Sequence, residues 1–161
     1  MARKKSKKLY VAYGSNLHVG QMSYRCPDAV VYGSGVLKNY DLTFWGNYHR
    51  NGVATVIPHP GTDVPVVVWE ISASDEKSLD RYEGWPRLYR KENIPVAMDD
   101  GSVITGMIYL MNESGMRPAY PSEYYFDTIK TGYEYFRFDQ KILEAARDKI
   151  LDPEYRFRKI W

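Results

Sequence analysis

The chain has 161 residues, of which 44% are hydrophobic, enough for one substantial core in a single domain. Its formal net charge of +2 hides an uneven distribution, because five of the 22 basic residues fall within the first eight positions. The other 17 basic residues face 20 acidic ones, so the rest of the chain carries a charge of −3. This balance argues against a surface that binds nucleic acid.

Residues 1–8 are predicted to form a basic disordered arm, and residues 9–161 a single domain. Contact of the arm with RNA or with an acidic lipid surface stays open as an alternative. No apolar run approaches the roughly 20 residues of a membrane span, and the N-terminus lacks the apolar core of a signal peptide. We therefore expect a cytoplasmic protein with no membrane partner.

The single cysteine, Cys26, excludes an internal disulfide and a metal site built from several cysteines. Because Pro27 follows it and only His18 is near it in the sequence, we interpret Cys26 as a small packed residue rather than a nucleophile. Together with His18, the other histidines, His49 and His59, show no spacing typical of metal ligands. The sequence therefore predicts no metal site.

The first predicted element is a buried strand at residues 8–13, which is apolar and aromatic and ends abruptly. Gly14, Ser15 and Asn16 follow it and tolerate the backbone angles of a tight turn. A short helix is expected over residues 17–25. Strand, loop and helix in succession direct backbone N–H groups into one concavity, which predicts an anion cradle. The alternative is a simple connection in which Ser15 or Asn16 caps the helix.

Further strands are predicted in the first half of the chain at residues 29–36, 40–45, 53–58 and 64–71. A turn is expected at Lys38 and Asn39, a polar loop at residues 46–52 and a second turn at residues 59–63. The last of these strands contains three consecutive valines, which indicates burial on both faces and a central place in the sheet.

The second half begins with a predicted helix that has Ser74 as its N-cap, an acidic first turn and Gly84 at its C-terminus. A hairpin with strands at residues 89–98 and 103–111 follows. Ser122 is expected to cap one helix and Asp139 another, and the tail at residues 152–161 is expected to wrap on the body. The pattern predicts an α+β domain with a β-rich core and flanking helices.

Glu83 is the residue with the clearest chemical signal. It stands at the end of the predicted helix, where the negative end of the helix dipole disfavours an ionised carboxylate. Tyr82 and Trp85 on either side can desolvate it further, so its pKa is predicted to be raised. A carboxyl group with a raised pKa is suited to general acid and base catalysis near neutral pH. The alternative is an exposed residue at a helix end.

Three motifs occur in order along the chain: Tyr-Gly-Ser-Asn-Leu at residues 13–17, Leu-Asp-Arg-Tyr-Glu-Gly at residues 79–84 and Pro-Ser-Glu-Tyr-Tyr at residues 121–125. Their order and spacing resemble the γ-glutamylcyclotransferase family. Gln21-Met22, Arg25-Cys26-Pro27 and Ala54-Thr55 before Pro58 are similar to its compact bacterial members. The resemblance extends from about Leu9 to Ala146.

This resemblance implies a small mixed β-barrel with flanking helices, in which the Tyr-Gly-Ser-Asn loop at one mouth faces a catalytic glutamate. It also implies an enzyme, free of cofactor and metal, that converts a small γ-glutamyl amine or peptide into 5-oxoproline and the released amine. Carried over by position, Glu83 is the general acid and base. The implied substrate-binding residues are Tyr13, Gly14, Ser15, Asn16, Leu17, Tyr89 and Tyr125.

Two other functions stay open from the sequence. One is a related lyase that uses the same carboxylate on another γ-acyl amine. The other is a non-catalytic module that binds a small carboxylate, with the basic arm engaging a partner.

Overall fold

The structure is a computed structural model that describes residues 7–47 and 50–157. Most of the predicted basic arm at residues 1–8 lies outside this part of the chain, so its disorder and its contacts stay predictions. The strands are β1 (Lys8–Ala12), β2 (Val30–Asn47), β3 (Arg50–Ile71), β4 (Tyr89–Met98), β5 (Val103–Met111) and β6 (Arg117–Pro118). The helices are α1 (Val19–Arg25), α2 (Ala73–Glu83), α3 (Glu123–Tyr135), α4 (Gln140–Asp148) and α5 (Pro153–Phe157), with 3₁₀ turns η1 (Ser15–Leu17) and η2 (Lys149–Leu151).

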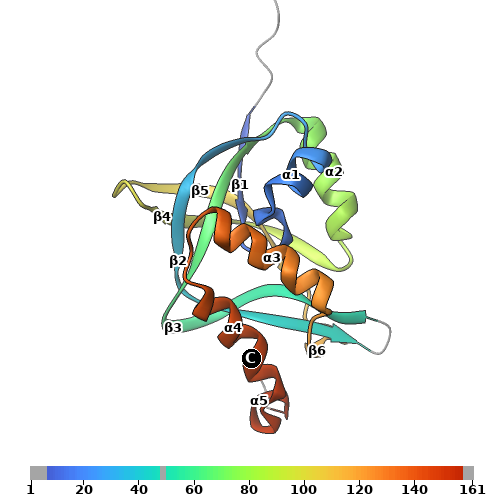
Figure 1. Ribbon diagram of the computed structural model, residues 1–161. Coiled ribbons are helices and arrows are strands. Elements are labelled where there is room, and N and C mark those ends of the chain that lie inside the picture. The colour runs from blue at the N-terminus through green and yellow to red at the C-terminus, as the bar shows by residue number, and fades with distance from the viewer. Residues whose placement is uncertain (1–6, 48–49, 158–161) are drawn as a thin grey trace, which may run out of the picture.

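Five strands form a closed mixed barrel with flanking helices, which confirms the predicted fold class (Figure 1). The strand order is β3-β1-β5-β4-β2, and pairing of β2 with β3 closes the ring. The pair of β1 and β5 is parallel, with Tyr10 opposite Met107, whereas the other pairs are antiparallel. The short strand β6 adds to β2 beside the ring. Each barrel strand therefore has a hydrogen-bonded neighbour on both sides, which protects its backbone polar groups.

The prediction of four separate strands in the first half is wrong. Strand β2 contains both 29–36, from residue 30 on, and 40–45, and strand β3 contains both 53–58 and 64–71. The register shows how the two strands continue: Lys38 pairs with Asp63, whereas Tyr40 pairs with Pro58. Residues 59–62 therefore bulge out of β3 opposite Asn39 of β2, and neither strand ends there.

The bulge has a local cause in Asn39 and Gly61. Both have positive φ angles, 64° and 88°, a conformation in which asparagine and glycine are the favoured residues. The Asn39 side chain accepts a hydrogen bond from the Gly61 backbone N–H at 3.0 Å, which joins the two irregular points across the strand pair. The next connection, predicted as a loop at residues 46–52, is shorter than expected, because β2 ends at Asn47 and β3 begins at Arg50.

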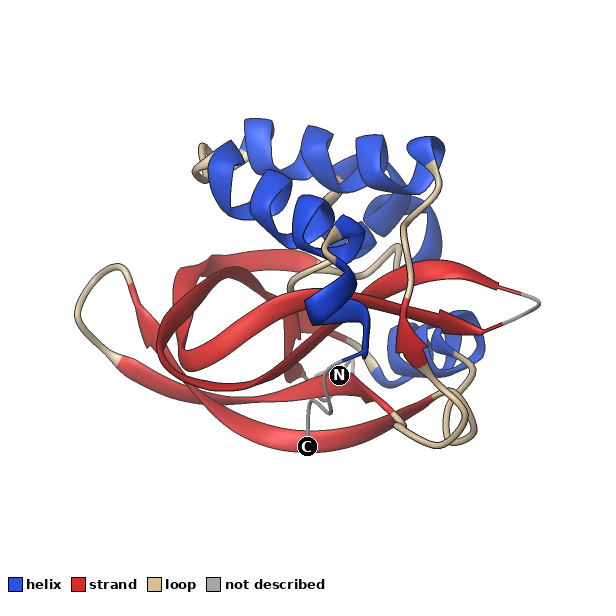
Figure 2. Ribbon diagram, turned by 90° about the horizontal axis from the view of Figure 1, so that it is seen from below, coloured by secondary structure: helices blue, strands red, loops and turns tan. Residues whose placement is uncertain are grey.

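Most of the helices gather on one side of the barrel (Figure 2). The N-cap of helix α2 is Ser72 rather than the predicted Ser74. The Ser72 hydroxyl accepts from the Asp75 backbone N–H, and the Asp75 carboxylate accepts from the Ser72 N–H. This reciprocal pair satisfies two backbone donors. Helix α2 ends at Gly84, which has a φ of 66°, as predicted for a C-terminal glycine.

The N-caps of the other helices agree in part with those predicted from the sequence. Ser122 caps α3 and Asp139 caps α4, as predicted. Helix α1 is capped by His18, whose Nδ1 accepts from the Gln21 N–H at 3.0 Å, and not by Ser15 or Asn16. The loop after β1 turns through η1 first, so these two residues are buried and their side chains make other contacts.

Helix α3 lies directly on η1. A Cβ atom at Gly132 would come within 2.5 Å of the Leu17 Cβ, so this contact requires glycine. Packing of α3 against η1 brings the Tyr125 hydroxyl beside Ala54 of β3. The helix thus completes one wall of the barrel mouth.

Two smaller predictions are confirmed. Cys26 is buried, with its thiol 3.7 Å from the Asp75 carbonyl, and burial raises its pKa to about 12, which suits a packed residue rather than a nucleophile. The described part of the tail forms α5 and packs on the body through a hydrogen bond of 2.7 Å between the Tyr155 and Thr43 hydroxyls.

Among the described residues, no helix has the length and apolar character needed to cross a membrane. In the same part of the chain, no group of three or more His, Cys, Asp or Glu side chains is placed to hold a metal ion.

Candidate functional site

A cavity of about 170 Å³ opens where the β1–η1 loop, the end of α2 and the helix α3 meet. Tyrosine side chains are the most frequent residues in its wall, and one carboxylate lies among them. The lining residues are Tyr10, Val11, Tyr13, Gly14, Ser15, Asn16, Val53, Ala54, Tyr82, Glu83, Leu88, Tyr89, Tyr109 and Tyr125.

Glu83 enters this cavity from the last position of α2. Its carboxylate faces the η1 loop, where the Asn16 amide N–H lies 3.4 Å from Oε1. Burial raises the pKa of Glu83 to about 7, and the positive charge of Arg25 opposes that rise. The burial that the sequence suggested is therefore present, and the group can exchange a proton near neutral pH.

The η1 loop presents both side chains and backbone to the cavity. Its backbone N–H groups at Leu17 and His18 are used inside the loop, since they donate to Gly14 and Ser15 carbonyls. The first N–H groups of such a turn, at Ser15 and Asn16, have no acceptor within it. Ser15 and Asn16 themselves line the cavity, and N–H groups at the start of such a turn suit a carboxylate or an oxyanion.

Two tyrosine hydroxyls hold the opposite wall through the backbone of Ala54. Tyr89 donates its hydroxyl to the Ala54 carbonyl at 2.7 Å, and the Ala54 N–H donates to the Tyr125 hydroxyl at 2.9 Å. Tyr13 donates its hydroxyl to the Tyr109 carbonyl at 2.6 Å. Burial raises the pKa values of Tyr13, Tyr89 and Tyr125 above their ordinary value, so these hydroxyls stay neutral.

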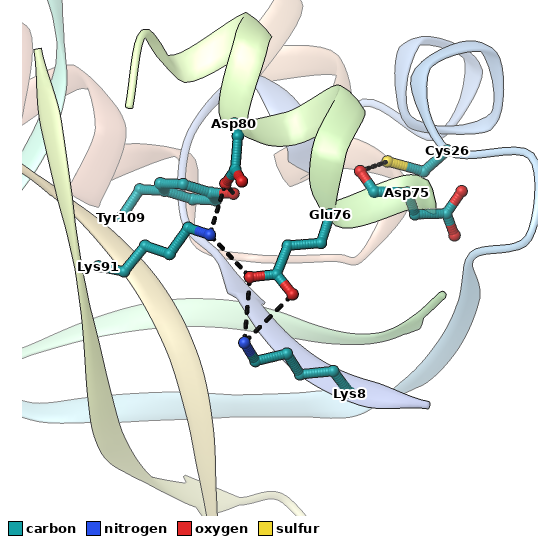
Figure 3. A network of polar contacts seen from close by, with 7 residues as sticks. All are labelled: Lys8, Cys26, Asp75, Glu76, Asp80, Lys91 and Tyr109. Atoms are coloured by element: carbon teal, nitrogen blue, oxygen red, sulfur yellow. Dashed lines mark hydrogen bonds and ion pairs between the residues drawn. The ribbon is translucent and has the colours of Figure 1, made fainter. Parts of the chain in front are cut away.

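A network of ion pairs fastens α2 to the barrel (Figure 3). The Lys91 ammonium lies 2.7 Å from both Glu76 and Asp80, which are one helical turn apart on α2. The Tyr109 hydroxyl donates to Asp80 at 2.6 Å, and Lys8 pairs with Glu76 on the outside at 3.0 Å. Because Tyr109 also lines the cavity, this network ties the orientation of α2 to the cavity wall.

The charges in this network shift two pKa values in opposite directions. Burial alone would raise the pKa of Glu76, but hydrogen bonds from Lys91 and Lys8 hold it below its ordinary value. Burial alone would lower the pKa of Lys91, but hydrogen bonds to Asp80 and Glu76 raise it. The ions thus stay paired at neutral pH and keep α2 in place.

The structure brings nearly all sequence-predicted site residues to one cavity. Glu83, Tyr13, Gly14, Ser15, Asn16, Tyr89 and Tyr125 all line it. Leu17 does not, because its side chain is fully buried beneath Gly132 of α3. No site role is predicted from the sequence for Tyr10, Tyr109 or Arg25. Tyr10 and Tyr109 line the cavity, and Arg25 contacts the site through Asn16.

A closed barrel with a carboxylate facing a Tyr-Gly-Ser-Asn loop is what the sequence resemblance implied, and comparison with known proteins agrees. A family model described as "Gamma-glutamyl cyclotransferase, AIG2-like" matches residues 10–127. The chain belongs to this family.

Named relatives and solved structures support the same family. The chain is 34% identical to the mouse protein named gamma-glutamylcyclotransferase over 157 residues, which cover 92% of this chain and 81% of that one. It is 35% identical to the cattle protein of the same name over 132 residues, covering 77% of this chain and 69% of the relative. A solved structure named gamma-glutamyl cyclotransferase superposes with a TM-score of 0.78 at 28% identity, covering 97% and 94% of the two chains.

Proposed function

We propose that this protein, an enzyme of the γ-glutamylcyclotransferase type, cyclises the γ-glutamyl group of a small amine or peptide to 5-oxoproline, with Glu83 as general acid and base. The observation that carries the proposal is a carboxylate with a pKa of about 7 that faces Asn16 of the η1 loop inside one cavity. A single domain over residues 9–161 and a cytoplasmic location are part of the proposal.

The chemistry is an intramolecular acyl transfer. Glu83 takes a proton from the α-ammonium group of the substrate, and the freed nitrogen attacks the γ-carbonyl carbon. The bond from this carbon to the amine nitrogen then breaks as Glu83 returns a proton to the departing amine. The α-ammonium loses two protons in all and the amine gains two on leaving as an ammonium ion, so no other reactant is consumed.

The cavity supplies orientation and charge stabilisation. Backbone N–H groups of the loop at Ser15 and Asn16 would hold the substrate carboxylate or the oxyanion that forms on the γ-carbonyl oxygen. Nucleophile and electrophile belong to one molecule, so holding the substrate in a folded conformation removes much of the entropic barrier. The tyrosine walls, with Tyr13, Tyr89 and Tyr125 neutral, exclude water without adding charge.

The test is release of 5-oxoproline from a panel of γ-glutamyl amines, γ-glutamyl amino acids and dipeptides by the wild-type protein and Glu83→Gln. Glutamine keeps the shape of the side chain and removes its basicity, so we expect kcat to fall by on the order of a hundredfold or more. Near wild-type turnover in this variant would exclude Glu83 as the acid and base. Release of another lactam from a different γ-acyl amine would favour a related lyase.

The pH dependence follows from the raised pKa. Glu83 must be ionised to accept the first proton. We therefore expect kcat/KM to increase with pH along an acid limb whose midpoint lies near pH 7. The limb is measured with the best substrate of the panel, using the exposed Arg87→Gln as a control that alters charge outside the cavity lining. A limb near pH 4.5 would mean that Glu83 is solvated and keeps its ordinary pKa.

A further inference from the structure

Arg25 ends α1 and does not line the catalytic cavity, yet its guanidinium is engaged on three sides. One N–H donates to the Asn16 side-chain oxygen at 2.6 Å, and another donates to Gln21 at 2.7 Å. The guanidinium carbon lies 3.4 Å from the centre of the Tyr82 ring, a cation–π contact. Arg25 therefore acts on the site indirectly, through its contacts with Asn16 and Tyr82.

The contact with Asn16 decides which way that amide points. A guanidinium only donates hydrogen bonds, so it must face the amide oxygen of Asn16. The amide nitrogen is then turned inward, where it donates to the Tyr10 hydroxyl at 2.9 Å and to Glu83 at 3.4 Å. Without Arg25 the amide can rotate and offer its oxygen to the Glu83 carboxylate, which would repel it.

The contact of Arg25 with Tyr82 restrains the loop at a second residue, Ser15. Tyr82 immediately precedes Glu83 in α2, and its hydroxyl lies 3.0 Å from the Ser15 hydroxyl. The planar cation stacked on its ring restricts a side chain that is still 44% exposed. Arg25 thus joins the loop, through Asn16, to the end of the helix that carries Glu83.

Arg25 is also the cation that acts on Glu83. The side chains that surround this carboxylate are Asn16 from the loop, Arg25 from α1, and tyrosines from the β1 region, α2, β4, β5 and α3: Tyr10, Tyr13, Tyr82, Tyr89, Tyr109 and Tyr125. Burial raises the pKa values of Tyr10, Tyr13, Tyr89, Tyr109 and Tyr125. The positive charge of Arg25 favours the ionised form of Glu83 against burial.

We propose that Arg25 is a positioning residue for the reaction: its guanidinium orients the Asn16 amide toward Glu83 and its charge keeps that carboxylate able to act as a base near neutral pH. This inference rests on the proposed role of Glu83. It assigns two separable tasks to one side chain, a hydrogen bond with planar geometry and a positive charge.

Substitutions at Arg25 separate the two tasks. Arg25→Met removes both, so we expect kcat to fall on the order of tenfold and the acid limb of kcat/KM to move up by roughly one pH unit. Arg25→Lys keeps the charge but loses the planar fork, so kcat should fall while the limb stays near its wild-type position. If Arg25→Met does not fold, Arg25→Gln takes its place, because it also removes the charge and is expected to move the limb the same way.

Arg81→Met is the matched control. Arg81 also carries a positive charge, lies two residues before Glu83 on α2 and is exposed, so its removal should change neither kcat nor the limb. An Arg25→Met enzyme with wild-type kcat and an unmoved limb would overturn the proposal. So would equal loss in the methionine and lysine variants with an unmoved limb in both, because that result indicates a structural role alone.

A second readout does not depend on turnover. The carboxyl carbon of Glu83 is followed by NMR in isotope-labelled protein, with the signal assigned by its absence in Glu83→Gln. The midpoint of its titration should move to higher pH in Arg25→Met and stay in place in Arg81→Met. A moved midpoint in a protein that releases no 5-oxoproline would support the electrostatic role of Arg25 while rejecting the proposed reaction, so the two failures are distinguishable.

Discussion

At the scale of single residues, the burial of Glu83 makes the free energy of unfolding depend on pH. Its pKa is raised from 4.5 to about 7 by burial, so between these values the folded protein holds a proton that the unfolded chain has released. The free energy of unfolding therefore falls as pH rises through this range. At about 1.4 kcal/mol per pH unit, the loss approaches roughly 3 kcal/mol above pH 7.

Glu83→Gln should remove this dependence. We expect the variant to exceed the wild type by roughly 3 kcal/mol in free energy of unfolding at pH 8, and to be close to it at pH 4. Urea unfolding at several pH values measures the difference. A difference that does not change with pH would show that the folded protein does not hold Glu83 protonated.

At the scale of elements, α2 depends on the cap at its first turn. Ser72 is buried, exchanges two hydrogen bonds with Asp75 and donates its hydroxyl to Asp28 at 2.8 Å. We expect Ser72→Ala to lower the free energy of unfolding by about 1–2 kcal/mol. Ser74→Ala, two positions along and exposed, is the control and should change it by less than about 0.5 kcal/mol. A larger loss in Ser74→Ala than in Ser72→Ala would mean that Ser74 is the N-cap, as the sequence predicted.

The same helix depends on Lys91 more than on Lys8. The Lys91 side chain is 19% exposed and bridges Glu76 and Asp80, whereas that of Lys8 is 48% exposed and pairs only with Glu76. We expect Lys91→Met to destabilise the protein by about 2 kcal/mol, and Lys8→Met by less than about 1 kcal/mol.

Salt separates the two lysines further. Exposed charges are screened at high ionic strength and partly buried ones much less. In denaturation measured with added salt, the loss caused by Lys8→Met should shrink, whereas that caused by Lys91→Met should persist. Equal losses that both vanish in salt would mean that the network in Figure 3 contributes little to holding α2.

At the scale of the whole molecule, local sequence was enough to predict those elements that depend only on their own residues. The hairpin of β4 and β5 and the caps at Ser122 and Asp139 follow directly from turn and capping chemistry. The long strands β2 and β3 do not, because asparagine and glycine with positive φ suit both a turn and a bulge. Only the pairing of the two strands over their whole length decides between these, and pairing is not visible in local sequence.

The residues of the site likewise divide into those that local sequence predicts and those that depend on how the elements pack. Glu83 and the loop at residues 13–17 were predictable because each lies in a short motif with a physical reason for its residue types. The part played by Arg25 was not, because it depends on the end of α1 packing against both the loop and α2. Tyr10 and Tyr109 likewise reach the cavity from strands β1 and β5, whose parallel pairing is a property of the closed barrel.

The tyrosine wall of the cavity also gives the protein an optical signature. Burial raises the pKa values of Tyr10, Tyr13, Tyr89, Tyr109 and Tyr125 around the cavity and of Tyr133 in α3. These phenols should stay un-ionised in an alkaline spectrophotometric titration for as long as the fold persists. Because the unfolded chain ionises all of its tyrosines, alkali favours unfolding, and the late rise in tyrosinate absorbance should coincide with loss of the fold.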